Sequence, residues 1–426
     1  MEYRVDEIVE INKNSLKKAN LPRYIKYLDT ANITKGKIDN IVNLDTKSDD
    51  IPSRARRLVQ TDDIIISTVR PNQEHYGYIE DSRSDLTVST GFVVLTPRKD
   101  LINPYYLYLT LTTDQMTRKL QSIAEDSTSA YPSIKPSVIG NQILKLPSMK
   151  TQNSIATFFS NIDNKIEVNN KLIANLEELS QTLFKRWFVD FEFPDENRNP
   201  YKSYEGEFQY LKNLKLPLSW TINTIADNAS GGIITGKTPS TKIKENYAPH
   251  GIPFITIPDM HKDVFVLNTE RYISELGMSK LKNKILPKNS ISVSCIATPG
   301  LVTITSKDSI TNQQVNSFQP NKNKLYYLYF TLKRMKGYIR DLGSGGSATL
   351  NLNKSQFSKI EVVSPTDDIL DNFNKLIEPN FHKILNLQKE NMNLSHLRDT
   401  LLPKLMSGEI ELPDELEVDE HAELLQ

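Results

Sequence analysis

The chain has 426 residues, 38% hydrophobic and 24% charged, which is typical of folded domains and excludes wholesale disorder. Its 52 basic and 52 acidic residues balance, but eight of the acidic ones lie in the last 18 residues, where Lys and Arg are absent. The preceding chain is therefore net positive, which permits a polyanionic partner. One cysteine excludes an internal disulfide. Without a signal-peptide core or a long apolar run, we expect a cytoplasmic protein with no membrane partner.

The chain begins with a strand-rich module in residues 1–147. Runs such as 64–66 and 91–95 are β-branched or apolar and are separated by Pro, Gly, Asn and Asp, a pattern typical of strands joined by turns. A tyrosine-rich segment at residues 105–111 predicts a short helix packed on that sheet. We therefore expect a mixed α/β unit.

Two long helices are predicted, at residues 148–190 and 366–408. Positions alternately four and three residues apart are apolar in eight of ten cases from Ile155 to Trp187, and in seven of ten from Phe373 to Leu405. Such a heptad seam is typical of a coiled coil. Between the helices, residues 191–365 comprise a linker and a second strand-rich module. Residues 409–426 form a C-terminal segment.

The two halves of the chain are similar to each other. Residues 105–111 read YYLYLTL and residues 326–332 read YYLYFTL, and the likeness continues as Leu176 matches Leu394 and Leu183 matches Leu401. A period above about 200 residues indicates a duplicated domain unit rather than a solenoid. The predicted fold class is α+β: two similar mixed α/β modules joined by two long antiparallel helices, with pseudo-two-fold internal symmetry.

The polar residues within the seams decide how the helices pair. Two amphipathic helices on separate cores would also fit the pattern. We favour mutual packing because an antiparallel pair with aligned ends places Asn169 against Asn391, and Ser180 against Asn380. A parallel pair would bury amides against leucine and isoleucine, at about 1–3 kcal/mol each.

The residues expected at the helix–helix interface come from the heptad seams of both helices. They are Ile162, Ile166, Asn169, Ile173, Leu176, Leu183, Ile384, Leu387, Asn391, Leu394 and Leu401. Arg398 would face Ile162 without an evident partner, and Pro379 should kink the second helix or begin its main section.

The helix length suggests a spacing function. Residues 155–187 would span about 50 Å at about 1.5 Å per residue. Since each module precedes its helix, antiparallel helices would carry the modules to opposite ends. That arrangement suits a DNA target with two read halves and an unread spacer.

Seven segments in both halves of the chain carry a family resemblance. They are residues 67–72 (STVRPN), 89–92 (STGF), 152–156 (QNSIA), 179–191 (LSQTLFKRWFVDF), 216–220 (LPLSW), 236–240 (GKTPS) and 397–410 (LRDTLLPKLMSGEI). In this order along a duplicated chain, they resemble the specificity subunit of a type I restriction–modification system, and the resemblance covers nearly the whole chain.

The resemblance implies a non-enzymatic subunit that binds double-stranded DNA through two target recognition domains. Its helices would dock two methyltransferase subunits, which methylate adenine with S-adenosylmethionine. Restriction subunits that use ATP and Mg would join them, and the chain itself would bind no cofactor. Because the first module lacks the opening seen at residues 216–220, residues 409–412 are expected to supply its missing strand, with a mobile acidic tail from Asp414 onward.

Two rival functions can be tested against the residues. A single-chain methyltransferase would use Asn103, Pro104, Tyr105 and Tyr106, but the second proline of the Asn-Pro-Pro-Tyr signature and a preceding glycine-rich loop are missing. These residues are better explained as a turn that opens the tyrosine-rich helix. The other rival is a coiled-coil scaffold with two ligand-binding β modules. The six histidines show no ligand spacing, so no metal site is predicted.

DNA contacts are expected from polar side chains on loops at strand ends, because guanidinium and amide groups suit phosphates and base edges. In the first module the candidates are Arg54, Arg56, Arg57, Arg70, Asn72, Gln73 and His75. In the second they are Lys237, Thr238, Lys242, Asn312, Gln313, Gln314, Ser344 and Ser347. The positional equivalents of the Arg70 loop, Thr298 and Gly300, form a poorer set. For each residue the alternative is an ordinary solvated surface position.

Overall fold

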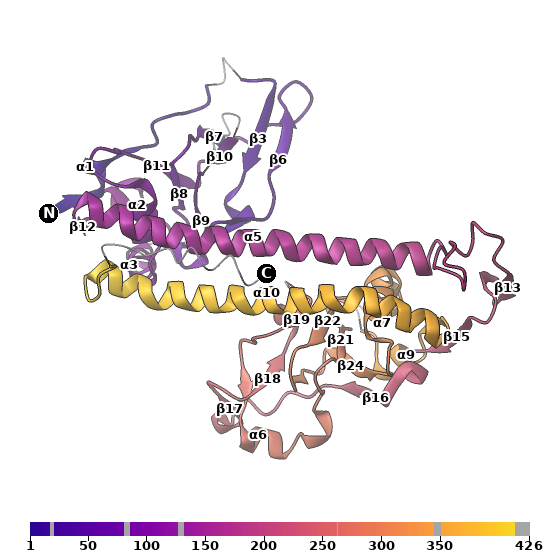
Figure 1. Cartoon of the computed structure of the whole chain (residues 1–426). Helices are drawn as coiled ribbons and strands as arrows, with labels where there is room; N and C mark the ends of the chain where they lie inside the picture. The colour runs from indigo at the N-terminus through magenta and orange to yellow at the C-terminus, as the bar shows by residue number, and fades with distance from the viewer. Residues whose placement is uncertain (18–20, 81–85, 127–131, 262, 345–350, 414–426) are drawn as a thin grey trace. The chain divides into compact units, whose positions relative to one another are not determined.

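The computed structural model describes residues 1–17, 21–80, 86–126, 132–261, 263–344 and 351–413. The chain divides into two compact units, one of residues 1–164 with 395–426 and one of residues 165–394. Each unit holds one module together with parts of both long helices (Figure 1). None of the helices in these described ranges is both long enough and apolar enough to cross a membrane.

The first module is built on two four-stranded sheets, ordered β6-β3-β10-β7 and β2-β11-β8-β9. Buried Ile65, Phe92 and Val94 from the second sheet pack with Leu28 and Val88 from the first. The strands are β1 (Glu2–Arg4), β2 (Val9–Ile11), β3 (Tyr24–Leu28), β4 (Ile33–Thr34), β5 (Lys37–Ile38), β6 (Val42–Asp45), β7 (Ala55–Leu58), β8 (Ile64–Ser67), β9 (Tyr76–Tyr78), β10 (Leu86–Ser89), β11 (Phe92–Pro97) and β12 (Ile143–Lys145). The helices are α1 (Val5–Ile8), α2 (Pro104–Leu111), α3 (Asp114–Glu125) and α4 (Pro136–Gly140).

The second module has a five-stranded sheet, β16-β24-β21-β22-β19, and a four-stranded one, β17-β20-β18-β23. Its strands are β13 (Phe208–Leu211), β14 (Leu214–Pro217), β15 (Thr221–Thr224), β16 (Ala229–Thr235), β17 (Tyr247–Ala248), β18 (Ile252–Ile255), β19 (Phe265–Val266), β20 (Tyr272–Ile273), β21 (Ile291–Ser294), β22 (Val302–Thr305), β23 (Ile310–Thr311), β24 (Val315–Pro320) and β25 (Glu361–Ser364). Its helices are α6 (Glu275–Ser279), α7 (Leu325–Arg334), α8 (Lys336–Gly343) and α9 (Lys354–Ser358). The tyrosine-rich segments are α2 and α7, so both modules are mixed α/β as predicted.

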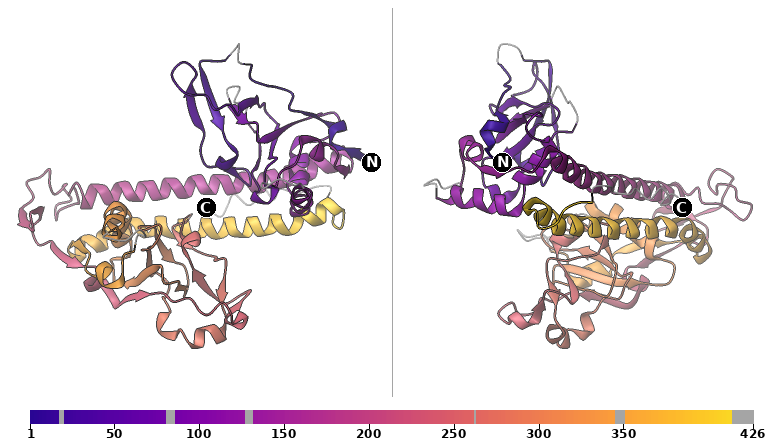
Figure 2. Two further views of the ribbon diagram at one scale, coloured as in Figure 1. Left: turned by 180° about the vertical axis from the view of Figure 1, so that it is seen from behind. Right: turned by 60° about the vertical axis from the view of Figure 1, so that its left-hand side comes forward.

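The long helices α5 (Met149–Phe188) and α10 (Asp367–Ser407) pack against each other. Within the second unit, the Asn169 Nδ2 donates to Asn391 Oδ1 at 2.9 Å, and Asn380 Nδ2 donates to Ser180 Oγ at 3.2 Å. Partner numbers fall along α10 as they rise along α5, so the pair is antiparallel, and each unit contains a side-by-side stretch of it (Figure 2). The predicted helix pairing is confirmed, and two helices on separate cores are excluded.

Two details of α10 differ from expectation. The helix begins at Asp367 and continues through Pro379, so the proline does not begin its main section. A proline inside a helix costs about 3 kcal/mol. Phe373, Ile377 and Phe381 are fully buried around that turn, and their packing offsets the cost. Arg398 also has a partner: its Nη1 donates to Asp163 Oδ1 at 2.8 Å.

The C-terminal segment does not form the expected strand in its described part, residues 409–413. Gly408 adopts a positive φ of 75°, which ends α10 in the left-handed conformation that glycine favours. The amides of Glu409 and Ile410 then donate to Lys404 O at 2.9 and 3.4 Å, so they cap the helix instead of pairing with a sheet. Residues 414–426, the predicted acidic tail, lie outside the described residues.

Candidate nucleic-acid interface

In the first module, the loop after β8 is held by backbone contacts with the segment that precedes α4. Val69 forms an antiparallel bridge with Ser133. On either side of it, Arg70 N donates to Pro132 O and Ile134 N donates to Thr68 O, both at 2.8 Å. The start of this loop is therefore fixed by the rest of the module.

The same loop has an unusual backbone. Arg70 and Glu74 take left-handed φ values of 49° and 55°, which non-glycine residues seldom adopt. Buried Pro71 anchors the turn between them, and Asn72 N donates to Gln121 Oε1 of α3 at 3.1 Å. Strained backbone of this kind clusters at functional sites. The side chains of Arg70, Asn72 and Gln73 are exposed on this frame.

The predicted arginine cluster separates in the structure. Arg54 is exposed, and its carbonyl accepts from Thr90 N beside the Thr68–Gly91 backbone contact, so it lies next to the loop. Arg56 is half-buried, with Nε donating to Ser53 O at 3.2 Å. Arg57 points inward: its guanidinium donates to Asn12 Oδ1 at 2.6 Å and to Phe92 O, and burial lowers its pKa.

His75 is likewise engaged within the module. Its Nδ1 lies 2.6 Å from Ile33 O, and the side chain is half-buried. Arg57 and His75 therefore stabilise the module through internal hydrogen bonds, and their side chains are less accessible to DNA than those of Arg70, Asn72 and Gln73. Sequence spacing alone gave no signal of this, because the partners Asn12 and Ile33 are far from these residues in the chain.

The second module carries a loop of the same design after β21. Ile296 bridges Asn351, Leu352 N donates to Cys295 O at 2.9 Å, and Ala297 has a left-handed φ of 62°. The exposed residues here are Ala297 and Thr298. Sequence reasoning did not single out Ala297, because an alanine carries no polar signal.

Most candidates of the second module gather beside this loop. Cys295 N donates to Gln314 O at 2.8 Å, which joins the loop to the turn before β24. Thr238 Oγ1 donates to Gln313 Oε1 at 2.6 Å, and Lys237 N donates to Thr311 O at 3.0 Å. Asn312 is buried, whereas Lys237 and Gln313 are exposed.

Gly236 allows the close approach of these segments. A Cβ at that position would lie 2.1 Å from Thr311 O, so only glycine fits. Lys242 is exposed farther along the same segment. Ser344 is exposed at the end of α8, with its Oγ donating to Asp341 O at 2.6 Å, and Ser347 lies outside the described residues.

Other functional sites find less support. Asn103 caps α2, since its Oδ1 accepts from Tyr106 N at 3.0 Å and its Nδ2 donates to Asn153 Oδ1 at 2.9 Å. Among the described ranges, no group of three His, Cys, Asp or Glu side chains has metal-binding geometry. A groove of about 910 Å³ lies beside α6, and none of the described candidate residues lines it.

The duplicated organisation matches a known family. The family model described as type I restriction modification DNA specificity domain matches residues 1–178 and again residues 219–392. The chain belongs to the family of type I restriction–modification specificity subunits. A specificity subunit is a non-catalytic component of the restriction–modification complex and supplies its DNA specificity.

Individual relatives agree with this assignment. The chain is 33% identical to the type I restriction enzyme HindI specificity subunit of Haemophilus influenzae, over 94% of this chain and 98% of the relative. It is 28% identical to the MjaIX specificity subunit of Methanocaldococcus jannaschii, over 79% and 76%. The crystal structure of the type I S subunit from M. genitalium has a similar fold, with a TM-score of 0.57, 16% identity and coverage of 97% and 96%.

Proposed function

We propose that this specificity subunit reads a split double-stranded DNA target, with one half read by each module. The observation that carries the proposal is the pair of loops after β8 and β21, which have the same backbone construction. Each places exposed side chains at one end of a sheet of its module, where a loop can enter a groove. The proposed contacts are Arg54, Arg70, Asn72 and Gln73 in the first module, and Lys237, Thr238 and Gln313 in the second.

The helix pair is proposed to set the unread spacer between the two halves. The hydrogen bond between buried Asn169 and half-buried Asn391 favours one register, because a shift would leave the Asn169 amide against an apolar neighbour. A fixed register gives the helix pair a fixed length. Antiparallel helices that each follow a module would hold the two modules at a constant separation.

The outer surface of the helices is proposed to dock two methyltransferase subunits. Val168, Leu172 and Leu179 are exposed large hydrophobic residues of α5, and Leu376 is one of α10. The three on α5 recur at helical spacing and lie off the seam, so they form one apolar stripe. Exposed apolar stripes mark protein interaction sites. The docked subunits would supply S-adenosylmethionine, and restriction subunits would supply ATP and Mg chemistry.

Mapping methylated adenines in cells with and without this chain tests the proposal. We expect one split motif that disappears without the chain. Exchanging residues 1–147 for those of a related subunit should change one half of the motif and leave the other half and the gap unchanged. Changes in both halves would contradict the modular assignment. A chain that binds no duplex at any salt concentration would support the scaffold alternative.

A further inference from the structure

The two loops share backbone contacts at their starts. Thr68 N donates to Gly91 O in the first module, and Cys295 N donates to Gln314 O in the second, both at 2.8 Å. These bonds tie the first loop residue to the turn before the neighbouring strand, β11 or β24. The loops therefore leave their sheets in the same way.

The next residues of the two loops agree as well. Val69 bridges Ser133, and Ile296 bridges Asn351. The residue after each bridge is left-handed, Arg70 with φ 49° and Ala297 with φ 62°. A buried proline follows in both loops, directly at Pro71 and one residue later at Pro299. Arg70 and Ala297 thus occupy the same place in equivalent frames.

The side chains at these equivalent places differ in chemistry. Arg70, Asn72 and Gln73 present a guanidinium and two amides, whereas Ala297 and Thr298 present methyl groups and one hydroxyl. Neither arginine nor alanine is favoured at a left-handed φ, so local backbone stability does not explain the choice of either residue.

We infer that these loops determine sequence specificity, with Arg70 selecting a guanine in one half of the target and Ala297 with Thr298 selecting a thymine in the other. The inference rests on the proposed function. A guanidinium donates to both O6 and N7 of guanine, and small apolar groups contact the thymine C5 methyl. The amides of Asn72 and Gln73 suit adenine beside that guanine.

The first loop is tested in the full chain assembled with its methyltransferase partners. Arg70→Ala should accept other bases at one guanine position, with discrimination reduced about tenfold to a hundredfold. Arg70→Lys keeps the charge but loses the planar fork, so its selectivity should fall between those of wild type and Arg70→Ala. If Arg70→Ala weakens binding but keeps wild-type selectivity, Arg70 contacts phosphate only and the inference is wrong. Arg118→Ala, an exposed arginine of α3 outside the loop, is the matched control and should keep the motif.

The second loop is tested with DNA in which deoxyuridine replaces thymine, because this change removes only the C5 methyl. Replacement of one thymine of the second half-site should weaken the affinity of the wild-type complex for the DNA several-fold. Ala297→Gly combined with Thr298→Ser should weaken binding to thymine DNA and lose the sensitivity to uracil. Sensitivity that persists unchanged in this variant would overturn the assignment. A wild-type complex that methylates no split motif would instead contradict the proposed function itself.

Discussion

The two modules meet the long helices at equivalent positions but through different chemistry. In the first unit, Tyr105 of α2 donates to Asp163 Oδ2 of α5 at 2.5 Å, and Arg398 of α10 pairs with the same carboxylate. In the second unit, Tyr326 of α7 packs on Phe381 of α10 with ring centroids 4.5 Å apart. Tyr105 matches Tyr326 in the internal repeat, and Asp163 matches Phe381.

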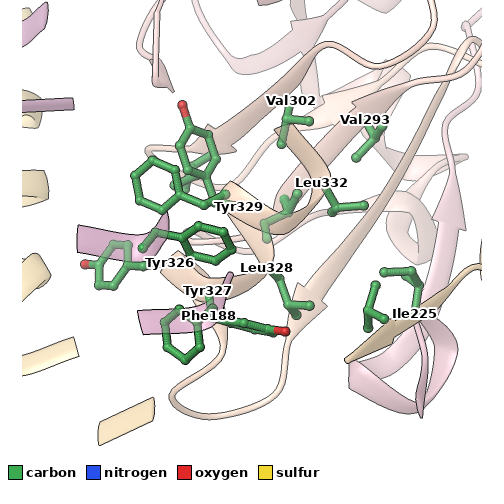
Figure 3. Packing of buried hydrophobic residues seen from close by; sticks show 14 of the residues in the cluster. Phe188, Ile225, Val293, Val302, Tyr326, Tyr327, Leu328, Tyr329 and Leu332 are labelled. Atoms are coloured by element: carbon green, nitrogen blue, oxygen red, sulfur yellow. The ribbon is translucent and has the colours of Figure 1, made fainter. Parts of the chain in front are cut away.

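The second junction is the centre of a large apolar cluster. Tyr326 and Tyr327 lie with Phe188 on one side of α7, and Leu328 and Leu332 lie on its other side, where Leu332 neighbours Val293 and Val302 of the sheet (Figure 3). Two polar contacts to Glu177 of α5 accompany them: Tyr329 donates to its carboxylate at 2.7 Å, and Lys333 of α7 forms an ion pair with it. Duplication therefore preserved the place of each junction and a carboxylate of α5 that contacts a tyrosine and a cation. The first junction is mainly ionic, whereas the second adds the aromatic packing of Tyr326 and Phe381.

The largest expected effect is at the aromatic junction. Phe381→Ala removes a fully buried ring and leaves a cavity among Tyr326, Tyr329 and Phe330, so the free energy of unfolding should fall by about 3–5 kcal/mol. Denaturant unfolding measures it. Leu376→Ala, at an exposed site on the same helix, is the control and should change little. Equal losses in both variants would show that Phe381 has no special role.

A smaller effect is expected at the ionic junction. Asp163→Ala leaves Arg398 without its main partner, and since their side chains are 29% and 32% exposed, the loss should be about 1–2 kcal/mol. Asp399→Ala removes the more exposed partner of Arg398 and should cost less than about 0.5 kcal/mol. Added salt should reduce the difference between wild type and Asp163→Ala, but leave the Phe381→Ala loss unchanged. A salt-sensitive loss in Phe381→Ala together with a salt-insensitive loss in Asp163→Ala would contradict the ionic assignment of the first junction and the aromatic assignment of the second.

The smallest effect concerns alkaline pH. Burial, and then the charge of Asp163, raise the pKa of Tyr105 above its usual 10.0. Above pH 10 the unfolded tyrosine loses its proton while the folded one keeps it, so the stabilising contribution is present below that pH and falls as pH rises. Tyr105→Phe should remove about 1 kcal/mol of this decline by pH 11. Thermal unfolding measured between pH 8 and 11 checks it, and parallel curves for both proteins would contradict it.

Much of the helix pairing could be predicted because a heptad seam depends on periodicity along one chain. The match of Asn169 to Asn391 followed from aligning the exceptions in two seams. The partner of Arg398 could not be found in this way, because Asp163 lies one position off the seam. The alternative that Pro379 begins the main section of α10 was wrong for a related reason: the cost of a proline depends on the packing around it, which only the folded helix pair shows.

The candidate site was predictable by region and less so by residue. Polar residues after a strand located the loop of Arg70, but the inward position of Arg57 depends on Asn12, which is far from it in sequence. Ala297 had no chemical signal of its own. It became a candidate only when its backbone angle and the Ile296–Asn351 bridge matched those of the first module.

The amino-acid order by itself determined the duplication, the mixed α/β character of each module and the antiparallel sense of the helices, since repeats and apolar periods are local properties of a chain. The tertiary structure decided which polar side chains face outward, what joins each module to the helices, and which loop positions are equivalent. Those features depend on contacts between residues distant in sequence, and side-chain burial is set by every neighbour at once.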